Sequence, residues 1–235
     1  MNKEEFIKRC KEINIEINSN YELLEKYYDL LIEWNKKFNM TTITKKEDVF
    51  LLHFYDSLLL SKYVNLNKNI ELCDFGTGAG FPGLVIAILF KNVNVTLIES
   101  NNKKCTFLKE VVKELELKNV IVINDRMEIY SKNNKEKFDI VTCRAVTLLP
   151  IILEIAVSSV KINGSIVPLK ANCDEEISMS KELLPKLELK LNKINEYYLP
   201  INNAKRTIIE YVKVGHTNSI YPRNYNVIIK KYKNK

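Results

Sequence analysis

The chain has 235 residues, of which 46% are hydrophobic and 28% are charged, a balance typical of a globular domain with a real core. It has neither the run of about eighteen apolar residues that a membrane helix needs nor an N-terminal secretory signal, so we expect a cytoplasmic protein without membrane contact. The net charge is +7, and residues 181–235 alone carry +8, which suits a polyanionic partner such as RNA, although a solvated lysine-rich surface gives the same pattern.

The first 60 or so residues predict helices. A first helix is expected around Phe6 and Cys10, and a second follows from the helical spacing of apolar side chains between Tyr21 and Phe38. A third runs through His53 to about Tyr63. We therefore expect residues 1–65 to form an N-terminal helical extension packed on the core, with the aromatic stripe of the second helix buried.

From residue 69 onward, short apolar strands alternate with helices. Strands are predicted at 70–75, 93–98, 120–123, 138–143, 165–169, 187–198 and 207–214, with a possible last strand at 225–232; helices are predicted at 82–90, 103–117 and 148–160. This alternation indicates an α/β fold whose mostly parallel seven-stranded sheet carries helices on both faces. We assign residues 66–235 to this Rossmann-like domain.

Four glycines lie within eight residues directly after the first strand, in the stretch CDFGTGAGFPG at 73–83. The P-loop pattern is excluded because Lys and Ser or Thr do not follow the last glycine. The dinucleotide pattern G-x-G-x-x-G fits only at 78–83, two residues too far from the strand end, and is weak evidence for a nicotinamide-dependent oxidoreductase.

A nucleoside ligand without phosphates suits the stretch better. Asp74 ends the strand and would repel a pyrophosphate, whereas it would attract a cation such as the α-ammonium of S-adenosylmethionine, directly or through water. Gly76, Gly78 and Gly80 form the turn and let the backbone approach the ligand. Glu99, at the end of the second strand, is placed to bind ribose hydroxyls, as in dehydrogenases too.

Six stretches together resemble the bacterial 16S rRNA (guanine-N7) methyltransferase family, of the RsmG/GidB type. They are 39–41, 53–58, 74–83, 102–104, 138–146 and 221–223. The resemblance implies a class I Rossmann-like methyltransferase that uses S-adenosyl-L-methionine, releases S-adenosyl-L-homocysteine and methylates N7 of a guanosine in small-subunit rRNA. It also implies donor contacts at Gly76, Phe81, Met127, Glu128 and Arg144. Met127 and Cys143 depart from the family's usual residues, which leaves the adenine pocket open in detail.

The chemistry of N7 agrees with the residues available. N7 of guanine has a lone pair and no proton to lose, so no general base is needed, and Arg144 is expected to act by positioning. Methylation of a pyrimidine C5 would need a cysteine nucleophile. Cys143 lies near the right place but is expected to be a small buried residue. The two histidines and scattered cysteines offer no metal site.

The expected partner is 16S rRNA or the small ribosomal subunit, bound by a monomer. Candidate RNA contacts are Asn39, His53, Lys103, Lys104, Arg206 and Arg223. His53, Asp56 and Ser57 share one helical face and are expected to form a polar network that joins the extension to the core, rather than a catalytic triad. A non-catalytic RNA-binding module on the same fold is the remaining alternative.

Overall fold

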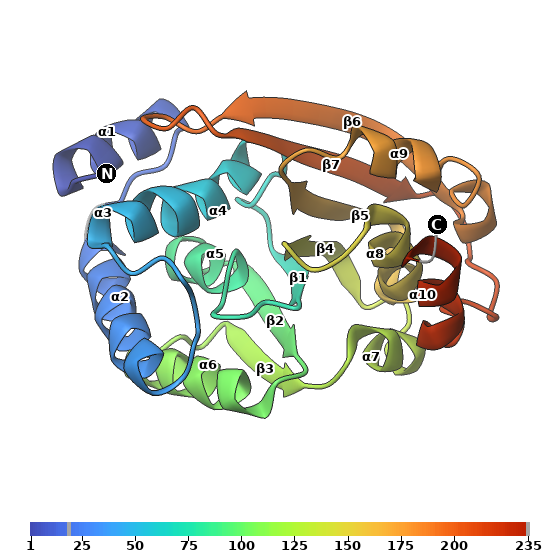
Figure 1. Ribbon diagram of the computed structural model, residues 1–235, viewed down its shortest axis with the longest axis horizontal. Coiled ribbons are helices and arrows are strands. Elements are labelled where there is room, and N and C mark those ends of the chain that lie inside the picture. The colour runs from blue at the N-terminus through green and yellow to red at the C-terminus, as the bar shows by residue number, and fades with distance from the viewer. Residues whose placement is uncertain (18–19, 234–235) are drawn as a thin grey trace.

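A seven-stranded sheet forms the centre of the computed structural model, which describes residues 1–17 and 20–233 (Figure 1). The strand order is β3-β2-β1-β4-β5-β7-β6, and the pairs from β3 to β5 are parallel, whereas β7 pairs antiparallel with both β5 and β6. The strands are β1 (Ile70–Phe75), β2 (Val93–Glu99), β3 (Val120–Asn124), β4 (Phe138–Arg144), β5 (Val160–Lys170), β6 (Leu189–Tyr198) and β7 (Lys205–Lys213). The predicted mostly parallel α/β fold is confirmed.

Helices cover the sheet and form the N-terminal region. The α-helices are α1 (Lys3–Glu12), α2 (Asn20–Lys37), α3 (Lys46–Val49), α4 (Asp56–Leu58), α5 (Gly83–Leu89), α6 (Asn102–Glu114), α7 (Met127–Asn133), α8 (Leu149–Ala156), α9 (Asp174–Ser180) and α10 (Tyr225–Lys233). The π-helical turn η1 (Phe50–Tyr55) joins α3 to α4, and the short 3₁₀ turns are η2 (Leu59–Lys62), η3 (Val157–Ser159) and η4 (Pro185–Leu187). The predicted third helix is therefore a run of short turns that change from α to π and 3₁₀ geometry.

One prediction about the C-terminus is wrong. Residues 225–232, considered as a last strand, form helix α10, which lies beside α7 and α8 in Figure 1. Ile228 and Tyr232, four residues apart, are both buried in the core cluster that contains α8. This burial on one helical face explains why the segment is helical.

Two apolar clusters lie against the sheet. One contains side chains of α2 and α5, such as Leu24 and Leu84, together with Phe6 and Phe54 of the N-terminal helices. The other contains side chains of α8 and α10. The N-terminal helices thus share a continuous core with the sheet, and the division of the chain at residues 65 and 66 stays a prediction.

Candidate active site

Three glycines after β1 have backbone conformations that side chains rarely adopt. The φ angles are 58° at Gly76, 62° at Gly78 and 105° at Gly80. A Cβ on Gly76 would lie 2.7 Å from Cγ2 of Val146, and one on Gly80 would overlap the Leu84 side chain, whereas one on Gly78 would meet no described atom within 4 Å. The backbone is therefore packed tightly at both ends of the loop and open at Gly78.

Asp74, near the end of β1, is hydrogen-bonded to both ends of this loop. Its side chain is fully buried, and Oδ2 accepts hydrogen bonds from the Thr77 hydroxyl at 2.6 Å and from the Gly83 N–H at 2.8 Å. Burial raises the pKa of the carboxyl to about 7. Oδ1 is buried without a hydrogen-bond partner among the described residues. Oδ2 therefore helps to hold the loop, and the predicted contact of Asp74 with the donor's ammonium group stays a prediction.

Glu99 fixes the other side of the loop. It is 7% exposed, its Oε2 accepts from the Gly78 N–H at 3.0 Å, and its Oε1 accepts from the Asn101 N–H at 2.8 Å. The Gly76 N–H donates to the carbonyl of Ile98 at 2.8 Å. The carboxylate therefore joins the glycine loop to the end of β2, and its predicted ribose contact stays a prediction.

A cavity of about 180 Å³, here called the glycine-loop cavity, opens beside Gly76. It lies at the ends of β1, β2 and β3 and is lined by Phe75, Gly76, Ile98, Ser100, Asp125, Arg126, Met127, Glu128, Val146, Thr147, Ile155 and Tyr225. Gly76, Met127 and Glu128 are thus the predicted donor contacts that the structure brings together. Tyr225 was missed, because only the packing of α10 brings it here.

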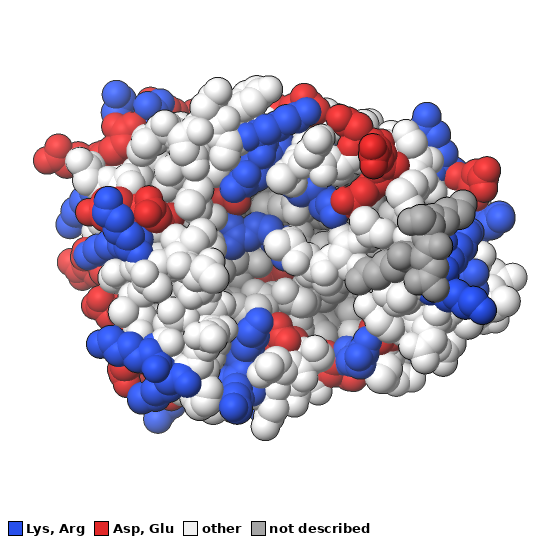
Figure 2. Space-filling view, viewed as in Figure 1, with Lys and Arg blue, Asp and Glu red and all other residues white. Residues whose placement is uncertain are grey.

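A second cavity, of about 470 Å³, lies at the ends of β4, β5 and β7 and is here called the arginine cavity. Its walls are Ile43, Leu52, His53, Asp56, Arg144, Ala145, Leu169, Lys170, Ala171, Asn172, Glu176 and Arg206. Figure 2 shows Lys and Arg side chains around a hollow in the middle of this face. Two predicted RNA contacts, His53 and Arg206, therefore lie beside the predicted positioning residue Arg144.

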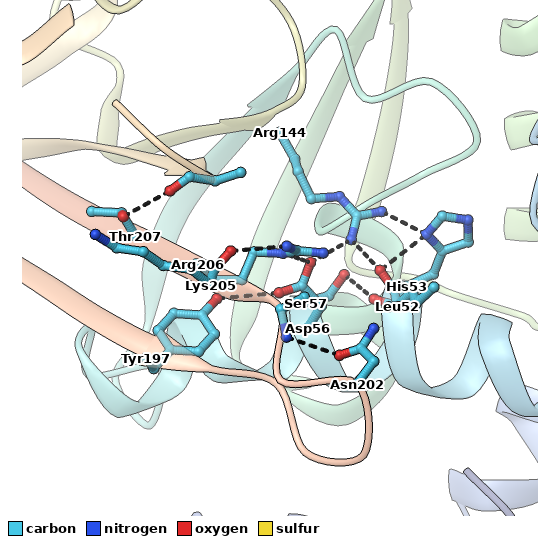
Figure 3. A network of polar contacts seen from close by, with 12 residues as sticks. Leu52, His53, Asp56, Ser57, Arg144, Tyr197, Asn202, Lys205, Arg206 and Thr207 are labelled. Carbon is cyan, nitrogen blue, oxygen red and sulfur yellow. Dashed lines mark hydrogen bonds and ion pairs between the residues drawn. The ribbon is translucent and has the colours of Figure 1, made fainter. Parts of the chain in front are cut away.

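Arg144 is held by the N-terminal helices (Figure 3). Its Nη1 donates to the carbonyl of Leu52 at 2.9 Å and to Asp56 Oδ2 at 3.1 Å. The Asp56 carboxylate is 1% exposed and also accepts from Arg206 Nε at 3.3 Å and from the Tyr197 hydroxyl at 3.2 Å. Asp56 thus joins α4 to β4, β6 and β7, as predicted for the polar network, whereas the Ser57 hydroxyl donates to the His53 carbonyl one turn earlier, at 2.5 Å.

His53 completes this network as a neutral side chain. Burial, together with the positive charge of Arg144, lowers its pKa to about 3. Arg144 Nη2 lies 3.0 Å from Nδ1, so Nδ1 accepts, and Nε2 carries the proton and donates to Thr41 Oγ1 at 3.0 Å. The ring stacks on Phe81, with 4.4 Å between centroids. Phe81, a predicted donor contact, is therefore buried against His53.

The short segment 144–147 borders both cavities. Arg144 and Ala145 line the arginine cavity, whereas Val146 and Thr147 line the glycine-loop cavity. Lys170 Nζ donates to the Thr147 carbonyl at 2.9 Å and pairs with Glu176 at 2.7 Å. The segment is therefore fixed at both ends, by Asp56 at Arg144 and by Lys170 at Thr147.

The remaining predicted RNA contacts do not line the arginine cavity. Asn39 and Lys103 are exposed, Lys104 is half-buried, and the Lys103 ammonium lies 4.9 Å from the Phe38 ring centroid. Arg223 instead pairs with the buried Glu154, with Nε–Oε1 and Nη2–Oε2 distances of 2.7 and 2.6 Å. Its guanidinium is therefore engaged with a buried carboxylate, and its predicted RNA contact stays a prediction.

Cys143, at the end of β4, lies inside the core. Cys143 is 1% exposed, and burial raises the pKa of its thiol. Within residues 1–17 and 20–233, no group of three His, Cys, Asp or Glu side chains is arranged to hold a metal ion. No helix in the described part of the chain is long and apolar enough to cross a membrane.

Comparisons with known proteins agree on one family. A sequence model described as rRNA small subunit methyltransferase G matches residues 20–205. The chain is 41% identical over 227 residues to ribosomal RNA small subunit methyltransferase G of Bacillus subtilis, covering 95% of each chain. It is 45% identical over 222 residues to the protein of the same name from Mycoplasma capricolum, covering 94% of each.

Solved structures share the fold at low sequence identity. A SAM-dependent methyltransferase from Aquifex aeolicus superposes with a TM-score of 0.54 at 16% identity, covering 78% of this chain and 98% of the other. A SAM-dependent O-methyltransferase from Thermotoga maritima gives a TM-score of 0.53 at 13% identity, covering 80% and 72%. These likenesses show the class I methyltransferase architecture.

Proposed function

The chain belongs to the rRNA small subunit methyltransferase G family, and we propose that it transfers the methyl group of S-adenosylmethionine to N7 of a guanosine in 16S rRNA. Family membership makes it an rRNA methyltransferase of the small subunit. The observation that carries the proposal is that one short segment, 144–147, borders both cavities, so the two lie next to each other. An in-line transfer needs the donor methyl group and the acceptor atom in contact within one shared space.

The glycine-loop cavity fits the nucleoside part of the donor. Gly78 leaves open space above the loop, the Asp74 Oδ1 atom is unpaired among the described residues, and Met127 offers an apolar wall. The donor supplies an electrophilic methyl group on a sulfonium and leaves as S-adenosylhomocysteine. Gly76, Met127 and Glu128 would contact it directly, and Asp74 and Glu99, which also hold the loop, are kept as proposed contacts of its ammonium group and ribose.

The arginine cavity fits a guanine base with its phosphates. Arg144, Lys170 and Arg206 bring three positive charges to its walls, and Asp56 and Glu176 bring two negative charges. Arginine suits guanine O6, which lies next to N7, as well as phosphate oxygens. We assign Arg144 to the acceptor side as a positioning residue, because its guanidinium is fixed by Leu52 and Asp56. His53 is neutral and engaged on both nitrogens, so it serves as a support for Arg144.

Isothermal titration with S-adenosylmethionine and with NADH, followed by transfer of a labelled methyl group to 16S rRNA, tests the proposal. Donor binding and label at N7, located by strand cleavage at 7-methylguanosine, are expected. Arg144→Lys should keep donor binding and reduce transfer, since Lys cannot form the same forked contacts. NADH binding would favour an oxidoreductase, and RNA binding without donor binding would favour a non-catalytic module.

Partner and location follow from the same proposal. A monomer would act on 16S rRNA, free or in the small ribosomal subunit, in the cytoplasm. Lys103, Lys104 and Arg206 are the basic residues that we keep as phosphate contacts. Binding should weaken steeply with salt, because each neutralised phosphate releases counterions.

A further inference from the structure

We infer that Tyr225, at the start of α10, is part of the donor site and stacks against the purine of the bound donor. This inference rests on the proposed function. Tyr225 is half-buried and lines the glycine-loop cavity together with Asp125, Met127 and Val146. It comes from a segment beyond residue 205, where the match to the family model ends.

The position of Tyr225 is fixed by the core and not by the cavity. Two residues before it, Arg223 pairs with the buried Glu154 of α8 at 2.6 and 2.7 Å. After it, Ile228 is fully buried against the core and Tyr232 is 7% exposed. Figure 1 shows α10 lying beside α7 and α8, the helices that follow β3 and β4. The ring is therefore presented to the cavity by a well-packed helix.

Arg126 supports the same wall. Its guanidinium lies 4.7 Å from the Tyr225 ring centroid, and its Nε pairs with Glu128 at 2.6 Å. Arg126, Glu128 and Tyr225 also line a larger neighbouring hollow of about 490 Å³. The Arg126 and Tyr225 side chains thus border both hollows.

The position of Tyr225 along the edge of the sheet indicates that it contacts the purine, and not the ribose or the amino-acid tail of the donor. Glu99, the predicted ribose contact, ends β2, whereas Asp125 to Glu128 follow β3 and border the cavity beside Tyr225. A flat aromatic ring that lines the same cavity as the apolar Met127 side chain suits a flat heterocycle. Stacking of a base on an aromatic side chain contributes about 1–3 kcal/mol.

Titration calorimetry with two probes tests this contact. S-adenosylhomocysteine carries the purine, ribose and amino-acid tail, whereas 5′-methylthioadenosine lacks the tail. Tyr225→Leu keeps apolar bulk against α8 but loses the ring, and should weaken both probes by the same factor, about 5- to 150-fold. Tyr225→Phe should bind both as the wild type does. Tyr198→Leu, at a tyrosine that is 58% exposed on β6, is the matched control.

The outcomes separate the two proposals. If the wild-type protein binds the probes and Tyr225→Leu, with an unchanged unfolding temperature, binds them equally well, the role of Tyr225 is refuted and the methyltransferase proposal stands. If only S-adenosylhomocysteine is weakened, Tyr225 contacts the tail and the assignment to the purine is wrong. If the wild-type protein binds neither probe, both proposals fall. If Tyr225→Leu unfolds, Tyr225→His, which keeps an aromatic ring, must bind more tightly than Tyr225→Ser for the inference to survive.

Discussion

Replacing Arg223 with Ala should destabilise the protein strongly, because it removes the partner of a buried charge. Glu154 is 0% exposed on α8, and its carboxylate receives Nε at 2.7 Å, Nη2 at 2.6 Å and the backbone N–H of Arg223 at 3.2 Å. Breaking a buried ion pair on one side costs about 3–5 kcal/mol. At about 2–4 °C per kcal/mol for a chain of this size, the unfolding midpoint should fall by roughly 6–20 °C.

Urea unfolding followed by circular dichroism, with scanning calorimetry, measures this loss. Arg9→Ala is the matched control, since Arg9 pairs with Glu5 at 2.7 Å with side chains 33% and 30% exposed. Such surface pairs contribute about 0–1 kcal/mol. The double variant Glu154→Met/Arg223→Met should recover much of the stability, because it leaves no buried charge behind.

One result would refute this reasoning. If Arg223→Ala unfolds like the wild type but binds 16S rRNA more weakly, with a smaller dependence on salt, Arg223 is a phosphate contact after all. The pair with Glu154 would then contribute little to the fold. The sequence alone favoured that outcome, whereas the structure favours the loss of stability.

Other expected outcomes concern pH, the glycine loop and Cys143. The pKa of His53 is lowered from 6.5 to about 3, so the unfolded chain binds a proton that the folded chain does not, and this group alone should lower stability by about 2 kcal/mol between pH 7 and pH 5. Asp74, whose pKa is raised to about 7, acts in the opposite direction in both proteins, so the measurement is the difference: His53→Asn should gain stability relative to the wild type when urea unfolding is moved from pH 7 to pH 5. Gly78→Ala should lower the free energy of unfolding by about 1–2 kcal/mol, because alanine disfavours the left-handed backbone. Gly80→Ala should lower it more, because its Cβ would also overlap Leu84, and equal urea unfolding midpoints for the two variants would contradict this packing. Cys143→Ala should methylate rRNA at the wild-type rate in a labelled-donor assay, since its thiol is buried and its pKa raised; loss of activity with an intact fold would indicate a nucleophile.

The parallel part of the fold was predictable because its signals are local. Each strand from β1 to β5 is a short apolar run followed by a helix or turn pattern, and this order alone indicates a parallel sheet. The secondary structure of residues 225–232 was ambiguous, because their apolar residues fit both the helical period of 3.6 residues and the strand period of two. The segment is a helix because Ile228 and Tyr232 are buried in the cluster that contains α8, and the sequence does not show this packing.

In the candidate site, too, some residues were predictable from the sequence and others were not. The glycines, Glu99 and Met127 stand next to strand ends, so their neighbourhood follows from the order of elements. The partners of the arginines do not, because a sequence shows a charge but not the distant carboxylate that binds it. Arg206 meets Asp56 across 150 residues, and Arg223 meets Glu154 across 69. Tyr225 was missed for the same reason.

The separation of Asp56 from its partners has a consequence for synthesis. Arg144, Tyr197 and Arg206 follow Asp56 by 88, 141 and 150 residues. At about 5–20 residues per second, Asp56 is made roughly 8–30 s before Arg206. Throughout this interval its carboxylate lacks at least one of the donors that later enclose it. The arginine cavity is therefore among the last parts to form, and a nascent chain that ends before β7 lacks one of its walls.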